Sequence, residues 1–210
     1  MIVILDLDYT LLDTAALKRS LEESVLPLGI TSTQFKETYD DTAQATPGRY
    51  NYSLVAHAHL MHERFGIDEA EALARLTSAL DMLPSALYPD TLPFLEKLTR
   101  ERIPMVLLTL GNPRLQEEKV AKLGIAKYFS RLFFTDGSKV TVRLELSESP
   151  GEWVFINDNP GELRDLSVRY PDAAMICIKR PGGKQFSPAE EALRFTTITS
   201  LDEAASLLDV

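Results

Sequence analysis

Two aspartates, Asp6 and Asp8, stand directly after an apolar run at residues 2–5. Four β-forming apolar residues in succession predict a strand that is buried on both faces of a parallel sheet. Ligands of open α/β sheets bind at the carboxyl ends of the strands, so both carboxylates are expected at a binding edge. Two neighbouring carboxylates repel each other, and a hard divalent cation such as Mg²⁺ relieves that repulsion. Capping of the turn that follows is the alternative for a D-x-D pattern.

A second apolar run, residues 105–108, leads into Thr109 and then into Gly111 and Asn112. The Thr109 hydroxyl is suited to donate to a phosphoryl oxygen, and main-chain N–H groups at the start of the next helix add donors for an anion. A threonine that caps a strand-to-helix turn is the alternative interpretation.

A third apolar run, residues 153–156, ends in a polar cluster that contains Asp158 and Glu162. Asp158 offers another carboxylate to a metal ion shared with the first strand. An Asx-Pro-Gly turn into a helix uses the same residues, and the two interpretations are compatible.

Residues 4–12, Ile-Leu-Asp-Leu-Asp-Tyr-Thr-Leu-Leu, closely resemble the first motif of the haloacid dehalogenase (HAD) superfamily. Phosphatase members of that superfamily read D-x-D-x-T after a hydrophobic strand. Thr109 stands where the second motif has Thr or Ser, and Asp158 with Glu162 resembles the fourth motif. Asn157 departs from that motif, because family members often have Gly or Asp there.

The resemblance implies a Mg²⁺-dependent phosphatase that hydrolyses a small phosphorylated metabolite through an aspartyl-phosphate. Asp6 would be the nucleophile, and Asp8 would protonate the leaving oxygen and then deprotonate the attacking water. The dehalogenases of the superfamily lack this second aspartate, so its presence favours phosphate chemistry. Thr109 and Lys139 would bind the phosphoryl oxygens. The candidates for substrate binding in the core are Thr109, Gly111 and Asn112.

The same resemblance implies a Mg²⁺ site at the strand ends. Asp6 and Asp158 would hold the ion through their carboxylates, and Asp8 would hold it through its main-chain carbonyl. Glu162 would hold a metal-bound water. Two alternatives stay open: a phosphomutase or other phosphotransferase of the superfamily, and a noncatalytic HAD-like binding protein.

The third motif of the family is a lysine between the second and fourth motifs. Lys139 is the candidate, since it follows the apolar run at residues 132–134 as the family pattern requires. No proline follows it, and residues 140–146 alternate apolar and polar side chains, which is typical of a strand where the family has a helix. Lys119 and Lys122 are alternatives, although their positions on a predicted helix indicate solvated side chains.

The apolar runs and the helical patterns between them predict the elements that position these residues. The predicted fold class is α/β, a doubly wound and mostly parallel Rossmann-like sheet with right-handed crossovers. The expected strands are residues 2–5, 105–108, 132–134, 153–156 and 175–178, and the expected core helices are residues 91–102, 113–123 and 201–208.

Residues 14–88 interrupt this alternation, because every pattern in them is helical. They predict an inserted all-helical cap of the family's C1 type, which would close over the site and read the leaving group. The predicted domains are a HAD-like core of residues 1–13 and 89–210 and a helical cap of residues 14–88. Arg49, in a loop of the cap, is a candidate for a second anionic group of the substrate, with a plain surface loop as the alternative.

Three histidines of the cap, His57, His59 and His62, are close in the sequence. On a helix only His59 and His62 share a face, and no Cys or acidic residue completes a metal site with them. Helix-surface histidines are therefore expected.

Composition narrows the classes of partner. The formal charge is −9, from 22 Lys and Arg against 31 Asp and Glu, which argues against nucleic acids and anionic membranes but leaves room for a small phosphorylated substrate. The single cysteine, Cys177, lies in an apolar run, which predicts a buried thiol and a reducing compartment. No signal peptide and no apolar run of about 20 residues is visible. We expect a cytoplasmic protein, either a monomer or a homodimer.

Overall fold

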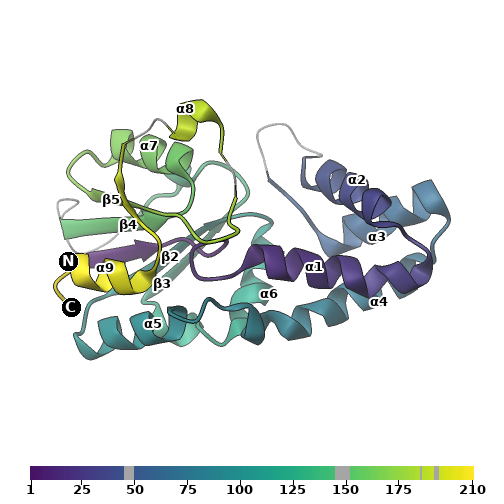
Figure 1. Cartoon of the computed structure of the whole chain (residues 1–210), viewed down its shortest axis with the longest axis horizontal. Coiled ribbons are helices and arrows are strands. Elements are labelled where there is room, and N and C mark those ends of the chain that lie inside the picture. The colour runs from purple at the N-terminus through teal and green to yellow at the C-terminus, as the bar shows by residue number, and fades with distance from the viewer. Residues whose placement is uncertain (45–49, 145–151, 185, 192–193) are drawn as a thin grey trace.

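The computed structural model of the chain describes residues 1–44, 50–144, 152–184, 186–191 and 194–210. Within these residues six parallel strands form one sheet in the order β3-β2-β1-β4-β5-β6 (Figure 1). Five of them match the predicted runs. The sixth, β6, was not predicted, because only one of its three residues is buried. The strands are β1 (Ile2–Leu5), β2 (Met105–Leu110), β3 (Arg131–Thr135), β4 (Trp153–Asn157), β5 (Ala174–Ile178) and β6 (Thr196–Ile198).

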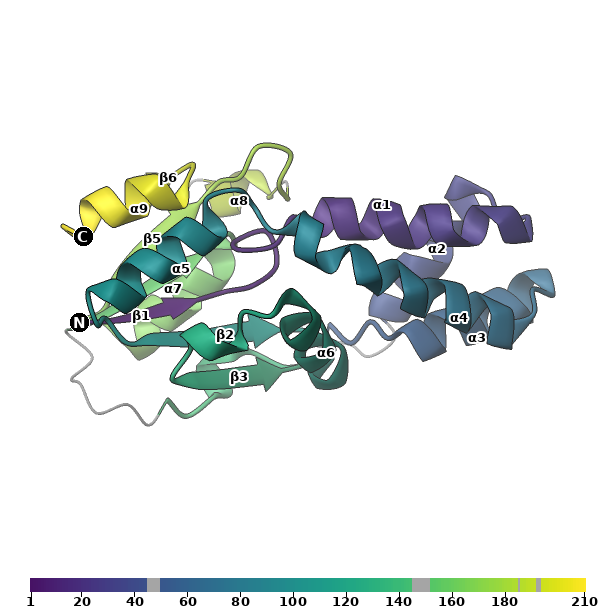
Figure 2. The same cartoon turned by 90° about the horizontal axis from the view of Figure 1, so that it is seen from below.

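Helices cover both faces of this sheet (Figures 1 and 2). β1 shows how the faces differ, because Val3 and Leu5 pack in one buried apolar cluster while Ile2 and Ile4 pack in the other. The architecture is therefore the doubly wound, Rossmann-like α/β fold that the sequence predicted. The first face carries α5 (Thr91–Arg100), α6 (Pro113–Leu123) and α9 (Leu201–Leu207), and the second carries α7 (Pro160–Arg169) and the short α8 (Pro188–Glu191).

Both ends of α6 carry residues that typically cap a helix. The Asn112 side chain accepts a hydrogen bond from the Leu115 main-chain N–H, and Pro113 occupies the first turn, where its missing N–H costs nothing. Gly124 ends the helix in the left-handed conformation at φ +66°. These local signals set the two ends of α6, which begins shortly after β2 ends.

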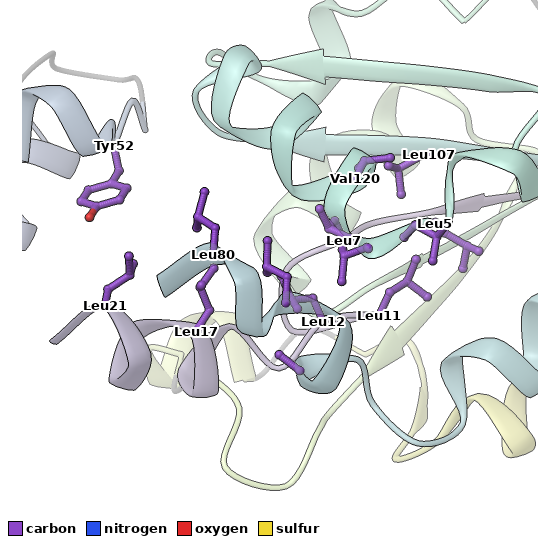
Figure 3. Close-up of a cluster of buried hydrophobic side chains, with 14 of the residues drawn as sticks. Leu5, Leu7, Leu11, Leu12, Leu17, Leu21, Tyr52, Leu80, Leu107 and Val120 are labelled. Carbon is purple, nitrogen blue, oxygen red and sulfur yellow. The ribbon is translucent and has the colours of Figure 1, made fainter. Parts of the chain in front are cut away.

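The helices between β1 and α5 pack on one another beyond the carboxyl ends of the strands (Figure 2). An antiparallel bridge between Leu12 and Leu87 joins the chain segments that enter and leave this helical region. Buried leucines continue from the sheet, at Leu5 and Leu107, to Leu17 of α1 (Figure 3). The boundary of the cap at residues 14–88 stays a prediction. The helices are α1 (Thr14–Val25), α2 (Ser32–Ala43), α3 (Leu54–Phe65), α4 (Glu69–Ala79) and the 3₁₀ helix η2 (Leu80–Ala86).

The segment after Lys139 is not the strand that its alternation indicated. A 3₁₀ turn, η4 (Lys139–Thr141), forms instead, with hydrogen bonds from the Thr141 N–H to the Ser138 carbonyl and from the Val142 N–H to the Lys139 carbonyl. Residues 142–144 join no strand of the sheet, and residues 145 and 146 lie outside the described part of the chain. The apolar side chains alternate because Val142 and Leu144 pack on the second cluster.

His57 corrects the expectation of three surface histidines, because its side chain is fully buried in the cap. Its two ring nitrogens lie 2.8 Å from the Thr38 hydroxyl and 2.9 Å from the Tyr52 hydroxyl. Those partners meet the imidazole's hydrogen-bonding needs and permit its burial among aromatic rings. His59 and His62 are exposed as expected, and the described residues contain no group of three or more His, Cys, Asp or Glu placed to hold a metal.

We expect the buried histidine to make stability depend on pH. Burial lowers the pKa of His57 to about 4, below its ordinary value of 6.5. The unfolded chain therefore binds the proton first as the pH falls. The stability that His57 contributes is complete above pH 6.5 and is lost between about pH 6.5 and 4, by roughly 3 kcal/mol. Urea unfolding across this range measures it. The His57→Gln variant should show a shallower loss than the wild type, whereas His62→Gln should follow the wild type; equal slopes for all three would contradict the assignment.

No helix among the described residues is long and apolar enough to cross a bilayer.

Candidate active site

The ends of three neighbouring strands bring the predicted residues together. β1 lies between β2 and β4, so the residues that follow β1 and β4 sit beside each other at one edge of the sheet. A cavity of about 380 Å³ opens at this edge, and its lining includes Asp6, Asp8, Asp158 and Glu162. The cavity extends from the sheet to the helices between β1 and α5. Its position matches the place where open α/β sheets bind their ligands.

Lys139 reaches the centre of this group from η4. Its ammonium lies 2.5 Å from a carboxylate oxygen of Asp6 and 2.8 Å from one of Glu162. The side chain is buried and is not among the residues that line the cavity. Burial opposes its charge, but the Asp6 and Glu162 carboxylates raise the pKa of Lys139 above its ordinary value. Lys139 is therefore a cation held between two acidic residues, which is the placement that the third motif of the family would require.

Asp6 is almost fully buried at the floor of the cavity. Besides Lys139, the Thr10 hydroxyl donates to its carboxylate at 3.3 Å. Burial raises the pKa of Asp6 to about 6; Lys139 opposes the rise, while Glu162 and Asp8 add to it. Proximity to other carboxylates is therefore a real cost at this position, and a bound cation would remove it.

Asp8 is surrounded by donors from α1 and α6. The Lys119 ammonium lies 2.8 and 3.1 Å from its two oxygens, the Thr14 hydroxyl donates at 2.6 Å, and the Gln116 amide donates at 2.7 Å. Although burial acts in the opposite direction, these donors together lower the pKa of Asp8. In this conformation Asp8 is an anion, and the proton that it would give to a leaving group is not yet on it.

The expectation that Lys119 is solvated was wrong. Lys119 is 6% exposed and forms an ion pair with Asp8. The sequence carried a signal for this, because Gln116, Lys119, Val120 and Leu123 have the i, i+3, i+4, i+7 spacing of one helix face, and all four are buried. Two polar residues on an otherwise apolar stripe need buried partners, and Asp8 is the partner. Lys122 instead forms an exposed ion pair with Asp81 at 2.7 Å.

Thr109 and Gly111 both contact Gln116, and of the two only Gly111 also lines the cavity. The Thr109 side chain is fully buried, its hydroxyl lies 2.8 Å from the Gln116 amide nitrogen, and it is not part of the cavity lining. Gly111 has φ +151°, and a Cβ at this position would approach that amide nitrogen to 3.0 Å. Glycine is therefore required where the chain passes Gln116. The binding roles predicted for Thr109 and Gly111 stay predictions.

Asn112 and Arg49 are the other two candidates for substrate binding, and the structure describes only Asn112. Asn112 lines the cavity, and its amide donates to the Asn51 side chain of the cap at 2.6 Å. It thus links the start of α6 to the segment before α3 beside the site. Arg49 lies outside the described residues.

The fit of a metal ion depends on Asp158 and its neighbours. In the described part of the chain no side chain donates to the Asp158 carboxylate, and burial together with Asp6 and Glu162 raises its pKa well above the ordinary value. Glu162 is occupied, because Lys139, Asn157 and Asn159 all contact its carboxylate. Asp158 is therefore the carboxylate most open to a hard cation, and Asp6, although it is paired with Lys139, lies close enough to raise the pKa of Asp158.

Charge at the site also favours a divalent ion. Four carboxylates (Asp6, Asp8, Asp158 and Glu162) face two ammonium groups that pair with them (Lys119 and Lys139). If all six are ionised, they carry a formal excess of two negative charges, which one divalent cation would offset. Lys18 and Lys184 also line the cavity and add positive charge around this group. Lysines pair with Asp6, Asp8 and Glu162, so within the described residues Asp158 is the one carboxylate of the four without a side-chain partner, and a cation would have to share Asp6 with Lys139.

Comparisons with known proteins identify the family and the shared fold. A model of the haloacid dehalogenase-like hydrolases matches residues 1–147. A search of curated proteins found no relative. Three solved structures share the fold over nearly all of both chains. A protein of Burkholderia xenovorans LB400 described as a haloacid dehalogenase-like hydrolase has 19% identity, coverage of 98% and 95% and a TM-score of 0.77.

The second structure is a HAD phosphatase from Thermococcus onnurineus, with 20% identity, coverage of 99% of this chain and 97% of the other and a TM-score of 0.63. The third is YfnB of Bacillus subtilis, described as a HAD hydrolase bound to magnesium, with 16% identity, coverage of 99% and 98% and a TM-score of 0.66. At these identities the structures show a shared fold.

Proposed function

We propose that this chain, which belongs to the haloacid dehalogenase-like hydrolase family, is a phosphatase that hydrolyses a small phosphate monoester through a phosphorylated Asp6. The observation that carries the proposal is the buried pair of Asp6 and Lys139 at the floor of a cavity that Asp8 and Asp158 also line. A carboxylate nucleophile, a fixed cation and a second aspartate within one enclosed site suit phosphoryl transfer.

The reaction would proceed in two steps. An oxygen of the Asp6 carboxylate attacks phosphorus, the bond from phosphorus to the ester oxygen breaks, and Asp8 gives a proton to that oxygen. Water then attacks phosphorus and gives a proton to Asp8, and the bond from phosphorus to Asp6 breaks and releases phosphate. Because Lys119 and Thr14 stabilise the ionised form of Asp8, Asp8 would have to leave these donors before it carries the proton of the first step.

Mg²⁺ is the proposed cofactor. Asp6 and Asp158 would hold it with the main-chain carbonyl of Asp8, and it would offset the repulsion between carboxylates and phosphate. Lys139 would hold negative charge on the phosphoryl oxygens close to Asp6. Support comes from the excess of acidic groups and from the absence of any side-chain donor to Asp158 among the described residues.

Phosphate release tests this proposal. We expect the protein to hydrolyse p-nitrophenyl phosphate when Mg²⁺ is present. Excess EDTA should remove at least 95% of this activity, which is about a twentyfold fall and is modest beside the rate effects of bound metals. The activity should return when Mg²⁺ is restored. Phosphate and p-nitrophenol should appear in equal amounts. Nitrophenol in excess of phosphate, with a phosphorylated acceptor in the mixture, would identify the phosphotransferase alternative. The absence of turnover, with retained Mg²⁺ binding, would favour a noncatalytic binding protein.

A further inference from the structure

The cavity has a second half, on the side of the cap, that the proposed chemistry does not use. Its wall is formed by Leu17, Leu21, Tyr39, Tyr52, Leu54 and Leu80, which we call the cap-side wall. All six side chains are buried in the apolar core, and Figure 3 shows four of them, Leu17, Leu21, Leu80 and Tyr52, grouped at this end of the cluster. A substrate whose phosphate meets Asp6 would extend its leaving group toward this wall.

Polar groups along the cap-side wall are already paired with one another. The hydroxyls of Tyr39 and Tyr50 lie 3.0 Å apart, and the Tyr52 hydroxyl lies 2.9 Å from a ring nitrogen of His57. The Asn112 amide donates to Asn51. Among the residues that the structure describes, these pairs leave aromatic and aliphatic surface facing the cavity, with few hydrogen-bonding groups for a ligand rich in hydroxyls.

Lys18 is the exception on this side of the cavity. Its half-buried ammonium lies 4.7 Å from the centroid of the Tyr39 ring. Within the described residues no carboxylate lies within ion-pair distance of it, whereas Lys119 and Lys139 are each paired. Lys18 therefore offers a positive charge that a ligand could meet, next to an aromatic surface.

We propose that the substrate is a phosphate monoester whose leaving group is an apolar, ring-sized body that carries one anionic group. The inference rests on the proposed phosphatase function and specifies its substrate class. The ring would lie against the cap-side wall, and the anionic group would meet Lys18. A sugar phosphate fits poorly, because each hydroxyl buried without a partner weakens binding by roughly tenfold.

The leading test compares three primary alkyl esters, so that the intrinsic reactivity of the leaving group is similar. They are 2-phenylethyl phosphate, 2-(4-carboxyphenyl)ethyl phosphate and glucose 6-phosphate. We expect kcat/KM for the carboxylated ester to exceed that for glucose 6-phosphate by about a hundredfold, with the unsubstituted aromatic ester between them. Equal or better hydrolysis of glucose 6-phosphate would overturn the proposal.

Two additions separate this inference from the proposed function. Acetyl phosphate, whose leaving group is too small to reach the cap-side wall, reports the core chemistry alone; turnover of acetyl phosphate without the aromatic preference would refute only the substrate class. Calorimetric binding of the same three esters to the Asp6→Asn variant measures the preference without turnover. Failure to hydrolyse any ester, together with tighter binding of the aromatic ones, would refute the phosphatase function and keep the binding preference.

Lys18 is tested by a matched pair of variants. Lys18→Met should reduce the ratio of kcat/KM between the carboxylated and unsubstituted esters from about ten to near one, since one charge-assisted contact is lost. Lys36→Met, which removes an exposed lysine of α2, should leave that ratio unchanged. If Lys18→Met also leaves it unchanged, the anionic group is not read by Lys18 and that part of the proposal fails.

Discussion

Replacement of Asp6 by Asn is expected to reduce phosphate release by a factor on the order of 10⁴ or more, because an amide cannot form the phosphorylated intermediate. The substitution keeps the shape of a side chain that is 6% exposed. It also removes one charge from a site with an excess of acidic groups, so the folded state should persist. Turnover of p-nitrophenyl phosphate, normalised to folded protein by near-UV circular dichroism, measures the effect.

The control for Asp6→Asn is Asp172→Asn, which makes the same change at an exposed position before β5. Its activity should stay within about twofold of the wild type, as is usual for surface changes away from a site. Mass spectrometry of the wild type, quenched during turnover, should place one phosphoryl group on the peptide that contains Asp6. An Asp6→Asn protein with more than a tenth of the wild-type activity would exclude Asp6 as the nucleophile.

Much of the fold and the grouping of site residues could be predicted from local patterns. Apolar runs set five strands, and the Asn112, Pro113 and Gly124 signals set both ends of α6. Parallel strands in a doubly wound sheet have their carboxyl ends at one edge, so residues after β1 and β4 had to meet. That rule brings Asp6 and Asp158 to one cavity although 152 positions (158 − 6) separate them in the sequence.

Partners that depend on tertiary packing were not predictable in the same way. Arg180 belongs to a stretch that composition indicates as an exposed loop, yet it is 8% exposed. Its guanidinium donates to both carboxylate oxygens of Asp90 and to the Thr10 carbonyl, which ties the loop after β1 to the start of α5. His57 and Lys119 were misplaced for the same reason: a polar residue on a helix is exposed or buried according to a partner on another element.

Loss of Lys139 is expected to have the largest effect on stability. Lys139→Met would leave the buried Asp6 and the partly buried Glu162 close together without their shared cation. Removal of one partner from a buried ion pair costs about 3–5 kcal/mol, a large part of the 5–15 kcal/mol typical of a domain. Urea unfolding at neutral pH without Mg²⁺ measures the change. Lys122→Met, which breaks the exposed pair with Asp81, should leave the unfolding midpoint unchanged.

The double variant Lys139→Met with Asp6→Asn distinguishes charge from packing as the source of that loss. If two unpaired carboxylates cause it, neutralising Asp6 should restore part of the stability, and the two changes will not add. If Lys139 matters only because its aliphatic chain fills space, the changes will add. If charge causes the loss of stability, Lys139 keeps in place carboxylates that repel one another. The same repulsion, still unrelieved at Asp158, would then favour a divalent cation, and Mg²⁺ should raise the unfolding midpoint of the wild type.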